Sequence, residues 1–459
     1  YGRISAFPDG VAYPTSLEEV QNLIAKANQI DCRLIPYGGG TSVVGHINPQ
    51  KSEAPIVTVD MRRMNRMLKF SETDYLATFE AGVRGPEIEA HLNHLGFTLG
   101  HYPQSFEFST LGGWIATRSS GQQSYFYGRI EDLFCGGRLE TAGGSLNLPI
   151  FPASAAGPDL GEMILGSEGR FGIITCATVQ IRRIPKVEKF YGVFFKSWES
   201  GLTAVRKAAQ SGLNFSMMRL SDPIETRATI LLSGQKKFIT ASEKILPKLG
   251  YGDNYCLLIF GITGERQSAR QTYREAMHIF KGRGVLPTME SIGKAWKKER
   301  FLAPYLRNSL WDLGVCVDTL ETAVPWSKIQ SLTNALKSTI TDAAEKFGES
   351  ILVFSHLSHV YRDGASIYVT FLFRRTADPD ELLERWKRIK KSASRTIIEH
   401  GGTISHQHGV GVDHAPYLHF EKGKIGMQII ESVQKSLDPN NLFNPCKLIQ
   451  SGWSTEDVE

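Results

Sequence analysis

The sequence lacks several features that would assign a class directly. No apolar run in the 459-residue chain reaches 18 residues, so no membrane-spanning helix is expected. The six cysteines are scattered and form no Cys-x-x-Cys pair, which argues against a zinc or iron–sulfur site and fits a reducing compartment. The net charge of +5 is dispersed, and the densest basic run, 385–391, has the spacing of a solvated helix face. No nucleic-acid partner is therefore expected.

Glycine, by contrast, is abundant in one region. Of the 44 glycines, 21 lie in the 135 residues from Gly38 to Gly172, about twice the usual density of roughly 7%. The apolar content of 41% and the charged content of 22% are ordinary for a globular protein, so the surplus does not indicate disorder. It predicts backbone that turns sharply or approaches another group closely.

Hydrophobic periodicity predicts two regions that meet near Pro185. The first opens with a helix over 16–28, where Ser16 and Glu19 have the spacing of a capping box. The second, of about 240 residues, has strand-like runs between long helical patterns, which predicts an α/β or α+β domain. Strands are expected over 32–35, 56–59, 75–81, 173–181, 190–195, 256–260, 351–354 and 367–373, and further helices over 86–95, 198–211, 265–280, 327–347, 380–400 and 424–437.

Three glycine-rich segments occur in the first region. The first, Gly38-Gly39-Gly40-Thr41-Ser42, follows a predicted strand, a context in which glycines let backbone N–H groups close on phosphate oxygens. A tight structural turn is the alternative for this segment alone. The second, 103–121, is rich in small and hydroxylated residues, and the third, 166–175, leads into a strand. Together the segments are suited to line the binding site of a long, flat, phosphorylated cofactor.

In this order and spacing, the segments resemble the FAD-binding domain of the vanillyl-alcohol oxidase / p-cresol methylhydroxylase superfamily. The resemblance implies an α+β/α/β protein with an FAD-binding domain over 1–185, completed by 430–459, and an α/β cap (substrate) domain over 186–429. It implies that the first two segments hold the FAD pyrophosphate and that the third packs near the adenine and ribose. The first loop lacks the His that attaches flavin in many relatives, so non-covalent FAD is expected. The residues assigned to FAD are Pro36, Gly38, Gly39, Gly40, Thr41, Ser42, Pro103, Ser109, Thr110, Gly112, Gly113, Ala116, Thr117, Ser119, Glu168, Gly172, Ile173 and Arg219.

Seven of the twelve histidines lie between His356 and His419. The densest group is His406-Gln407-His408-Gly409. Two histidines at i and i+2 point to the same side of an extended segment, which suits metal ligation or acid–base chemistry. A hydrogen-bonded structural pair is the alternative. Glycines at 409 and 411 favour a loop held close to another group, and therefore a function.

Two subfamilies compete for this segment. Alkyl-dihydroxyacetonephosphate synthases carry three consecutive histidines there, and metal-dependent D-2-hydroxyacid dehydrogenases carry Glu-His-Gly; Gln407 departs from both. The dehydrogenases also have two metal-binding histidines where this chain has Tyr361 and Tyr368, and neutral phenols are poor ligands compared with imidazole. No metal is therefore expected. The segment around Tyr368 resembles the synthases, which places this tyrosine at the active site; a strand aromatic is the alternative.

Two arginines complete the predicted site. Arg307 lies in a segment similar to one in the synthases, where the equivalent Arg is expected to meet the substrate phosphate, a task suited to guanidinium. Arg219 lies in a segment that is similar to one in the synthases, where the equivalent Arg supports the structure on the flavin side. A surface ion pair is the alternative for each.

The resemblance implies exchange of the acyl chain of acyl-dihydroxyacetone phosphate for a fatty alcohol, an ether-lipid step without net redox change. Arg307 is assigned as the phosphate anchor, His406 and His408 as proton-handling groups, and Tyr368 as an acid–base or orienting phenol. The rival is an FAD-dependent dehydrogenase or oxidase of a 2-hydroxyacid or a glycerol-phosphate-type substrate. The expected substrate is a lipid-like phosphorylated small molecule, and a homodimer is expected. The expected location is the cytoplasm, with peripheral membrane contact, or the peroxisome if a eukaryotic leader precedes this sequence.

Overall fold

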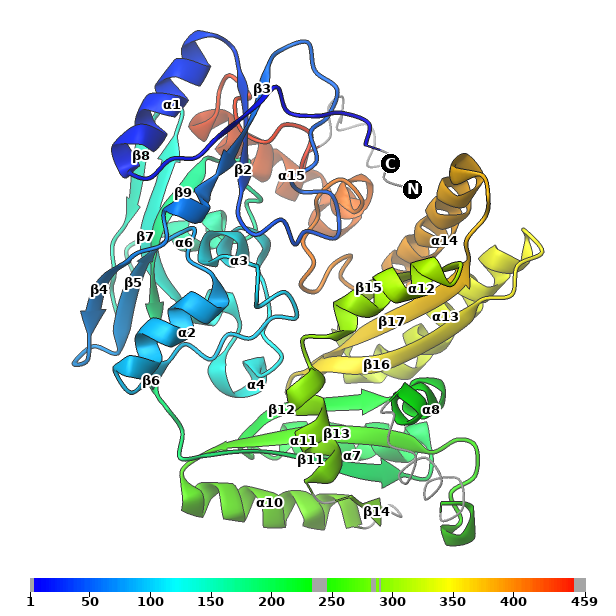
Figure 1. Ribbon diagram of the computed structural model, residues 1–459. Helices are drawn as coiled ribbons and strands as arrows, with labels where there is room; N and C mark the ends of the chain where they lie inside the picture. Colours follow the sequence, from blue (N-terminus) through cyan, green and yellow to red (C-terminus); the bar gives the residue numbers. More distant parts are fainter. Residues whose placement is uncertain (1–3, 233–245, 282–285, 289, 450–459) are drawn as a thin grey trace. The chain divides into compact units, whose positions relative to one another are not determined.

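The computed structural model describes residues 4–232, 246–281, 286–288 and 290–449 and divides into two compact units (Figure 1). The first unit comprises 1–121, 127–184 and 407–459, and the second comprises 122–126 and 185–406. The chain returns to the first unit at Gln407, whereas the sequence predicts the return at 430. The reason lies in backbone hydrogen bonding, because the amide of Val412 donates to the carbonyl of Val44 over 2.8 Å. Residues 1–3 and 450–459, both within the predicted FAD domain, lie outside the described residues.

The first unit contains three sheets. A parallel sheet has the strand order β1-β3-β2, and an antiparallel sheet has the order β4-β5-β9-β7-β8. The short strands β6 and β10 pair with each other. The strands are β1 (Gly10–Ala12), β2 (Arg33–Tyr37), β3 (Ile56–Asp60), β4 (Met67–Ser71), β5 (Leu76–Glu80), β6 (Phe97–Thr98), β7 (Phe134–Thr141), β8 (Gly144–Leu148), β9 (Ile173–Gln180) and β10 (Arg182–Arg183).

Helices of this unit begin where the sequence supplies caps. Ser16 accepts a hydrogen bond from the amide of Glu19 at the start of α1, and Thr110 accepts one from the amide of Gly113 at the start of α3. Two buried clusters form the cores, one around Phe79, Trp114 and Ile115 and one around Leu34. The helices are α1 (Leu17–Gln29), α2 (Gly85–His94), α3 (Leu111–Thr117), α5 (Ile130–Leu133), α6 (Leu160–Ile164) and α15 (Leu418–Leu437), while α4 (Ser124–Tyr127) spans the boundary of the units.

The second unit is built on one antiparallel sheet of seven strands, in the order β14-β11-β13-β12-β16-β17-β15. Neighbours in this sheet come from distant parts of the chain, as where β12 pairs with β16. The strands are β11 (Val187–Phe195), β12 (Phe215–Ser221), β13 (Cys256–Gly264), β14 (Leu286–Pro287), β15 (Val315–Pro325), β16 (Leu352–Val360) and β17 (Gly364–Arg374).

Helices cover the two faces of this sheet unequally. The larger apolar cluster joins one face to α7, α10, α13 and α14, and includes Leu320, Leu357 and Ile367 from the sheet. Residues next to these in sequence point to the opposite face, because side chains alternate along a strand. A smaller cluster packs α8 and α11 on that opposite face. The helices are α7 (Trp198–Gln210), α8 (Pro223–Leu232), α10 (Arg266–Lys281), α11 (Ser291–Glu299), α12 (Leu306–Asp312), α13 (Ile329–Glu345) and α14 (Pro379–Glu399).

Two further observations concern the apolar helices and the cysteines. None of the helices in the described ranges combines the length and apolarity needed to cross a bilayer. All six cysteines are free thiols, and burial raises the pKa of five of them: Cys32, Cys135, Cys176, Cys256 and Cys316.

Candidate functional site

The first glycine loop follows β2 and is packed against the second glycine segment. A Cβ atom added to Gly38 would lie 2.2 Å from Oγ1 of Thr110, and one added to Gly39 would lie 1.9 Å from the carbonyl oxygen of Phe108. Gly40 has φ of +67°, a conformation that favours glycine. Across the described part of the chain, the backbone amides from Gly38 to Ser42 donate to no protein acceptor. The loop therefore presents a row of amide donors.

The second segment uses its own amides to fix α3. The amide of Leu111 donates to Val83 (3.0 Å), that of Gly112 donates to Ala81 (2.8 Å), and that of Gly113 is capped by Thr110. Gly112 is required for this packing, because an added Cβ would lie 2.8 Å from Cβ of Ala81. Gly112 and Gly113 thus hold the helix in place, and their amides are not open to a ligand.

The third segment connects the glycine loops to the C-terminal part of the unit. The carboxylate of Glu168 accepts hydrogen bonds from the amides of Val410 and Gly411, the latter over 2.8 Å. His46 Nε2 lies 2.9 Å from Glu168 Oε1, and His46 Nδ1 lies 2.7 Å from Oγ of Ser42. Through His46, one buried carboxylate therefore links the first loop to the residues that follow His408.

In the second unit, polar side chains gather on the face of the sheet opposite its main core. Glu321 on β15, Tyr368 on β17 and His356 on β16 are aligned across three neighbouring strands. The ring of Tyr368 stacks on that of His356, with centroids 4.9 Å apart, and its hydroxyl donates to Oγ1 of Thr319 (3.1 Å). Burial raises the pKa of Tyr368, so the phenol stays protonated at neutral pH and acts as a donor.

Arg219 and Glu225 fix the other side of His356. The Glu225 carboxylate lies 2.8 Å from Arg219 Nη2 and 2.9 Å from His356 Nδ1. Burial alone would raise the pKa of Glu225, but its contacts with His356 and Arg219 hold it at about 2. Burial, assisted by Arg219, lowers the pKa of His356. The pair therefore keeps a carboxylate ionised next to the Tyr368 ring.

A second network lies beside the first and contains His406. Glu321 Oε1 is 3.1 Å from Nδ1 of His406 and 3.5 Å from Nδ1 of His359, and Tyr361 OH lies 2.5 Å from Nε2 of His406. Glu321 is fully buried. Burial opposes its charge, yet His406 and His359 keep its pKa well below the usual range. The network can hold a proton on imidazole and pass it through the Tyr361 hydroxyl.

The same groups are the ones in the described ranges that could hold a metal ion. The ligand atoms of Glu321, His359 and His406 all lie within 4.8 Å of one another. His359 stands two residues before Tyr361, the position at which this sequence lacks the metal-binding histidine of the dehydrogenases. Two imidazoles and a carboxylate are suitable zinc ligands. Each is also engaged in the hydrogen-bonded network described above.

Comparisons with known proteins agree with the two-part organisation. A family model described as an FAD binding domain matches residues 8–147, and one described as the C-terminal domain of FAD-linked oxidases matches residues 184–448. Alkyldihydroxyacetonephosphate synthase of Dictyostelium discoideum is 34% identical over 455 residues, which are 98% of this chain and 74% of that protein. The chain belongs to the alkyldihydroxyacetonephosphate synthase family.

Solved structures support the family assignment. A structure of alkyldihydroxyacetonephosphate synthase matches 95% of this chain and 75% of its own, at 32% identity and a TM-score of 0.80. p-Cresol methylhydroxylase matches with a TM-score of 0.73 at 14% identity, over 96% of this chain and 88% of its own, which shows a shared fold. The predicted two-domain fold of the vanillyl-alcohol oxidase / p-cresol methylhydroxylase type is confirmed. The chain is an FAD-dependent enzyme, as its sequence predicted.

The geometry of the first loop fits FAD. A pyrophosphate offers only acceptor oxygens, and the amides from Gly38 to Ser42 form a continuous row of open donors in the same unit as the other glycine segments. Small residues are needed there, since the loop backbone touches Phe108 and Thr110.

The structure brings together most of the predicted residues, within one unit or the other. All residues assigned to FAD except Arg219 lie in the first unit, where Gly169 packs on Pro36 and the amide of Glu168 donates to Ala116 (2.8 Å). Other assigned side chains serve local structure: Thr117 donates to Gly113, Ser119 pairs with His101, and Ser109 accepts from Trp114. Pro103 and Ile173 are buried, and a Cβ at Gly172 would lie 2.3 Å from the carbonyl oxygen of Glu140.

The predicted catalytic residues are divided between the units. Tyr368 and His406 belong to the two adjoining networks of the second unit, to which Arg219 also contributes. His408 belongs to the first unit and is half-buried. Arg307 is exposed on α12 and takes part in neither network.

Members of the networks that the sequence did not predict as site residues include Glu225, Glu321, His356, His359 and Tyr361. A charged residue inside the apolar strand 315–325 was one available signal. The segment Ser355-His356-Leu357-Ser358-His359 was another, because it places four polar side chains within an otherwise apolar strand.

Proposed function

We propose that this protein exchanges the ester-linked fatty acid of acyl-dihydroxyacetone phosphate for a fatty alcohol, which yields the alkyl ether. The relationship to alkyldihydroxyacetonephosphate synthases along nearly the whole chain carries the proposal. The exchange is balanced: a carboxylate leaves, the alcohol oxygen takes its place, the alcohol proton is released, and no electrons are gained or lost overall. When bound, FAD supplies the reactive isoalloxazine ring at which this exchange takes place.

The protein itself must handle a proton and orient the reacting groups. Tyr368 is a neutral phenol that donates to Thr319 in this structure. By turning this single donor from Thr319 to the substrate, it can orient an oxygen of the substrate. His406 is the proton-handling group, since Glu321 holds its Nδ1 and Nε2 faces the hydroxyl of Tyr361. Glu321 acts through His406 and is a positioning residue. This arrangement suits acceptance of the alcohol proton.

FAD would be held by the open amides of the first loop, with the other predicted residues of the three glycine segments shaping the site around it. Among these, Gly112 and Gly113 act by holding α3 in place. Non-covalent binding is supported by two facts. The loop 38–42 contains no histidine, and both ring nitrogens of the nearby His46 face protein groups.

Arg307 remains our proposed phosphate anchor, because its exposed guanidinium forms no ion pair within the described ranges and is open to an anion. His408 remains a proposed proton-handling group on the strength of the synthase resemblance. A homodimer, a cytoplasmic location and peripheral contact with a membrane also remain proposals. The membrane contact is supported by the fatty chains of the proposed substrates, which partition into bilayers.

The decisive experiment compares ether formation with flavin reduction. Purified protein loaded with FAD is given acyl-dihydroxyacetone phosphate and a long-chain alcohol without an electron acceptor, and the alkyl ether and free fatty acid are expected in equal amounts. Anaerobic addition of a 2-hydroxyacid or of glycerol phosphate is expected to leave the flavin spectrum oxidised. Bleaching of the flavin by either compound, with no ether product, would assign the protein to redox chemistry instead.

A further inference from the structure

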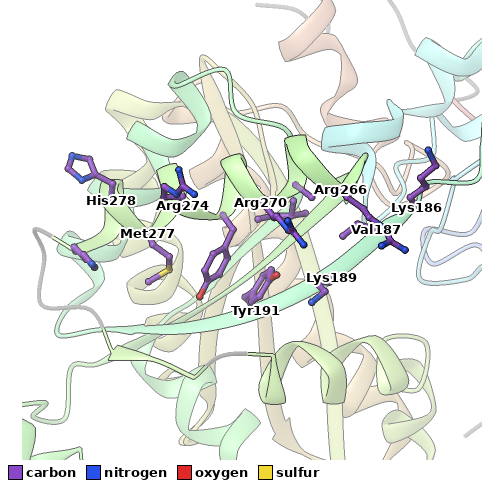
Figure 2. Close-up of a pocket in the computed structure, with 13 residues that line it drawn as sticks. Lys186, Val187, Lys189, Tyr191, Arg266, Arg270, Arg274, Met277 and His278 are labelled. Atoms are coloured by element: carbon purple, nitrogen blue, oxygen red, sulfur yellow. The ribbon is translucent and has the colours of Figure 1, made fainter.

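Ligand-binding clefts measure about 300–1,000 Å³. A groove of about 930 Å³ lies between α10 and strand β11 of the second unit (Figure 2). Arg266, Arg270 and Arg274 follow one another along α10 at intervals of four residues, and Figure 2 shows them in a row beside the strand that carries Lys189 and Tyr191. Both walls of the groove are therefore cationic. It belongs to neither network of the site described above.

Among the described residues, the arginines of α10 have no ion-pair partners. All three are exposed, and none forms an ion pair or hydrogen bond to the residues that the structure describes. Like charges at i, i+4 destabilise a helix, so this row costs stability unless an anion neutralises it. The acidic residues nearby serve the lysines instead: Glu265 pairs with Lys186 (3.0 Å) and Glu290 with Lys189 (2.7 Å).

The spacing indicates several anionic groups in a row. Arg266 and Arg274 are eight residues apart, which is about 12 Å along a helix. A single phosphate reaches one or two of these guanidinium groups, whereas a row of phosphates reaches all of them.

The aromatic residues of the groove favour phosphates over bases. Tyr191 packs on Tyr273 with centroids 4.5 Å apart, and on Phe260 with centroids 5.3 Å apart. Their faces are occupied by one another, so they offer little stacking surface to the bases of a single-stranded nucleic acid.

We propose that the α10 groove binds the phosphate-bearing headgroups of an anionic membrane and so docks the second unit on a lipid surface. The choice of lipid rests on the proposed function, whose substrates carry fatty chains and dissolve in bilayers. Anionic headgroups at a bilayer surface attract clustered Lys and Arg side chains, and the groove supplies such a cluster.

Vesicle sedimentation tests the proposal without substrate. The FAD-loaded protein is mixed with vesicles of phosphatidylcholine alone or of phosphatidylcholine and phosphatidylserine at about 7:3, and binding is expected only to the anionic vesicles and to weaken with salt. The triple variant Arg266→Gln/Arg270→Gln/Arg274→Gln is expected to lose affinity about 100-fold. It should keep its activity on substrates dissolved in detergent micelles.

A matched control removes the same charges at the same helical spacing elsewhere in the second unit. Lys387, Lys391 and Arg395 are exposed along α14, so Lys387→Gln/Lys391→Gln/Arg395→Gln changes the net charge equally. This control is expected to bind vesicles like the parent protein. Equal losses in both triple variants would overturn the proposal, as would binding to a single-stranded oligonucleotide but not to anionic vesicles. Absence of synthase activity from a protein that docks through α10 would refute the proposed function alone.

Discussion

Tyr368 illustrates how position sets the role of a side chain. The phenol is buried, stacked on His356 and hydrogen-bonded to Thr319, and burial raises its pKa. We expect Tyr368→Phe to keep its fold and its FAD but to lose turnover by about 10²–10⁴-fold, because the variant lacks only the donor hydroxyl. The rate of ether formation and the flavin-to-protein absorbance ratio measure the two effects.

Tyr125→Phe is the matched control, since the hydroxyl of Tyr125 donates to the carbonyl of Ala209 in the same unit, outside both networks. It should retain normal turnover. Near-normal activity of Tyr368→Phe would remove this residue from the proposed mechanism.

Glu321, His359 and His406 can be explained without a metal, because the ionised carboxylate is shared by two imidazoles. We therefore expect dialysis against EDTA to change ether formation by less than about twofold. Loss of activity on dialysis and its recovery with Zn²⁺ or Mn²⁺ would establish a metal site at these residues. Elemental analysis of the purified protein gives an independent measurement.

The histidine-rich segment and Tyr368 were predicted as site residues from the sequence, but the partners of His406 were not. Glu321 lies 85 residues before His406, and only the pairing of β15 with β17 places it beside Tyr368. The local sequence of either strand does not predict that pairing. The open amides of the first loop could be anticipated, whereas the use of Gly112 and Gly113 in holding α3 depends on contacts with Ala81 and Val83.

At the scale of elements, Glu225 joins α8 to strands β12 and β16. Its pKa is about 2 in the folded protein and near 4.5 in an unfolded chain, so the unfolded state binds more protons between these values. The contribution of this group to stability is complete above about pH 4.5 and decreases as the pH falls toward 2. Its full size is about 3 kcal/mol.

Glu225→Gln is therefore expected to be less stable than the parent at neutral pH but to lose less stability on acidification. Between about pH 5.5 and 3.5, the loss in the free energy of unfolding should be about 1 kcal/mol smaller in the variant, as measured by urea denaturation. Glu384→Gln, at an exposed pair on α14, should follow the parent. Parallel curves for the parent and Glu225→Gln would contradict the assignment.

The contact between the first two glycine segments gives a second prediction at this scale. A Cβ at Gly39 would lie 1.9 Å from a backbone oxygen, which cannot move aside as a side chain can. Gly39→Ala should therefore displace the loop and lower the FAD content of the purified protein at least tenfold. Gly143→Ala is the control, since its Cβ would have no neighbour closer than 3.8 Å. Full FAD content in Gly39→Ala would show that the loop does not hold the cofactor.

Helices whose own sequence supplies caps and an apolar stripe were predicted with nearly correct bounds. The helix expected over 16–28 is α1 (Leu17–Gln29), and that expected over 380–400 is α14 (Pro379–Glu399), because caps and a strong apolar stripe define both. Strands β12 and β15 were missed. Their polar side chains, among them Arg219 and Glu321, interrupt the apolar pattern for reasons that belong to the site rather than to the strand.

At the scale of the whole molecule, each unit has its own apolar core, and the chain enters the second unit and leaves it again. The chain first passes from one unit to the other between 184 and 185. Near Pro185 the sequence changes from glycine-rich segments to strand-like runs separated by long helical patterns. The return between His406 and Gln407 has no such signal. It depends on the bonds of Glu168 to Val410 and Gly411, which join segments more than 240 residues apart.

The buried thiols have a practical consequence for work on the intact protein. The thiolate is the reactive form of cysteine, and burial suppresses it at both Cys256 and Cys316, the cysteines of the second unit. A new thiol on the exposed surface of α10, as in Gln271→Cys, would therefore react with a maleimide dye well before either of them. With the half-buried Cys446 of the first unit replaced by Ser, an environment-sensitive fluorophore could be attached there without removing the other native cysteines, and it would report directly on what approaches that helix.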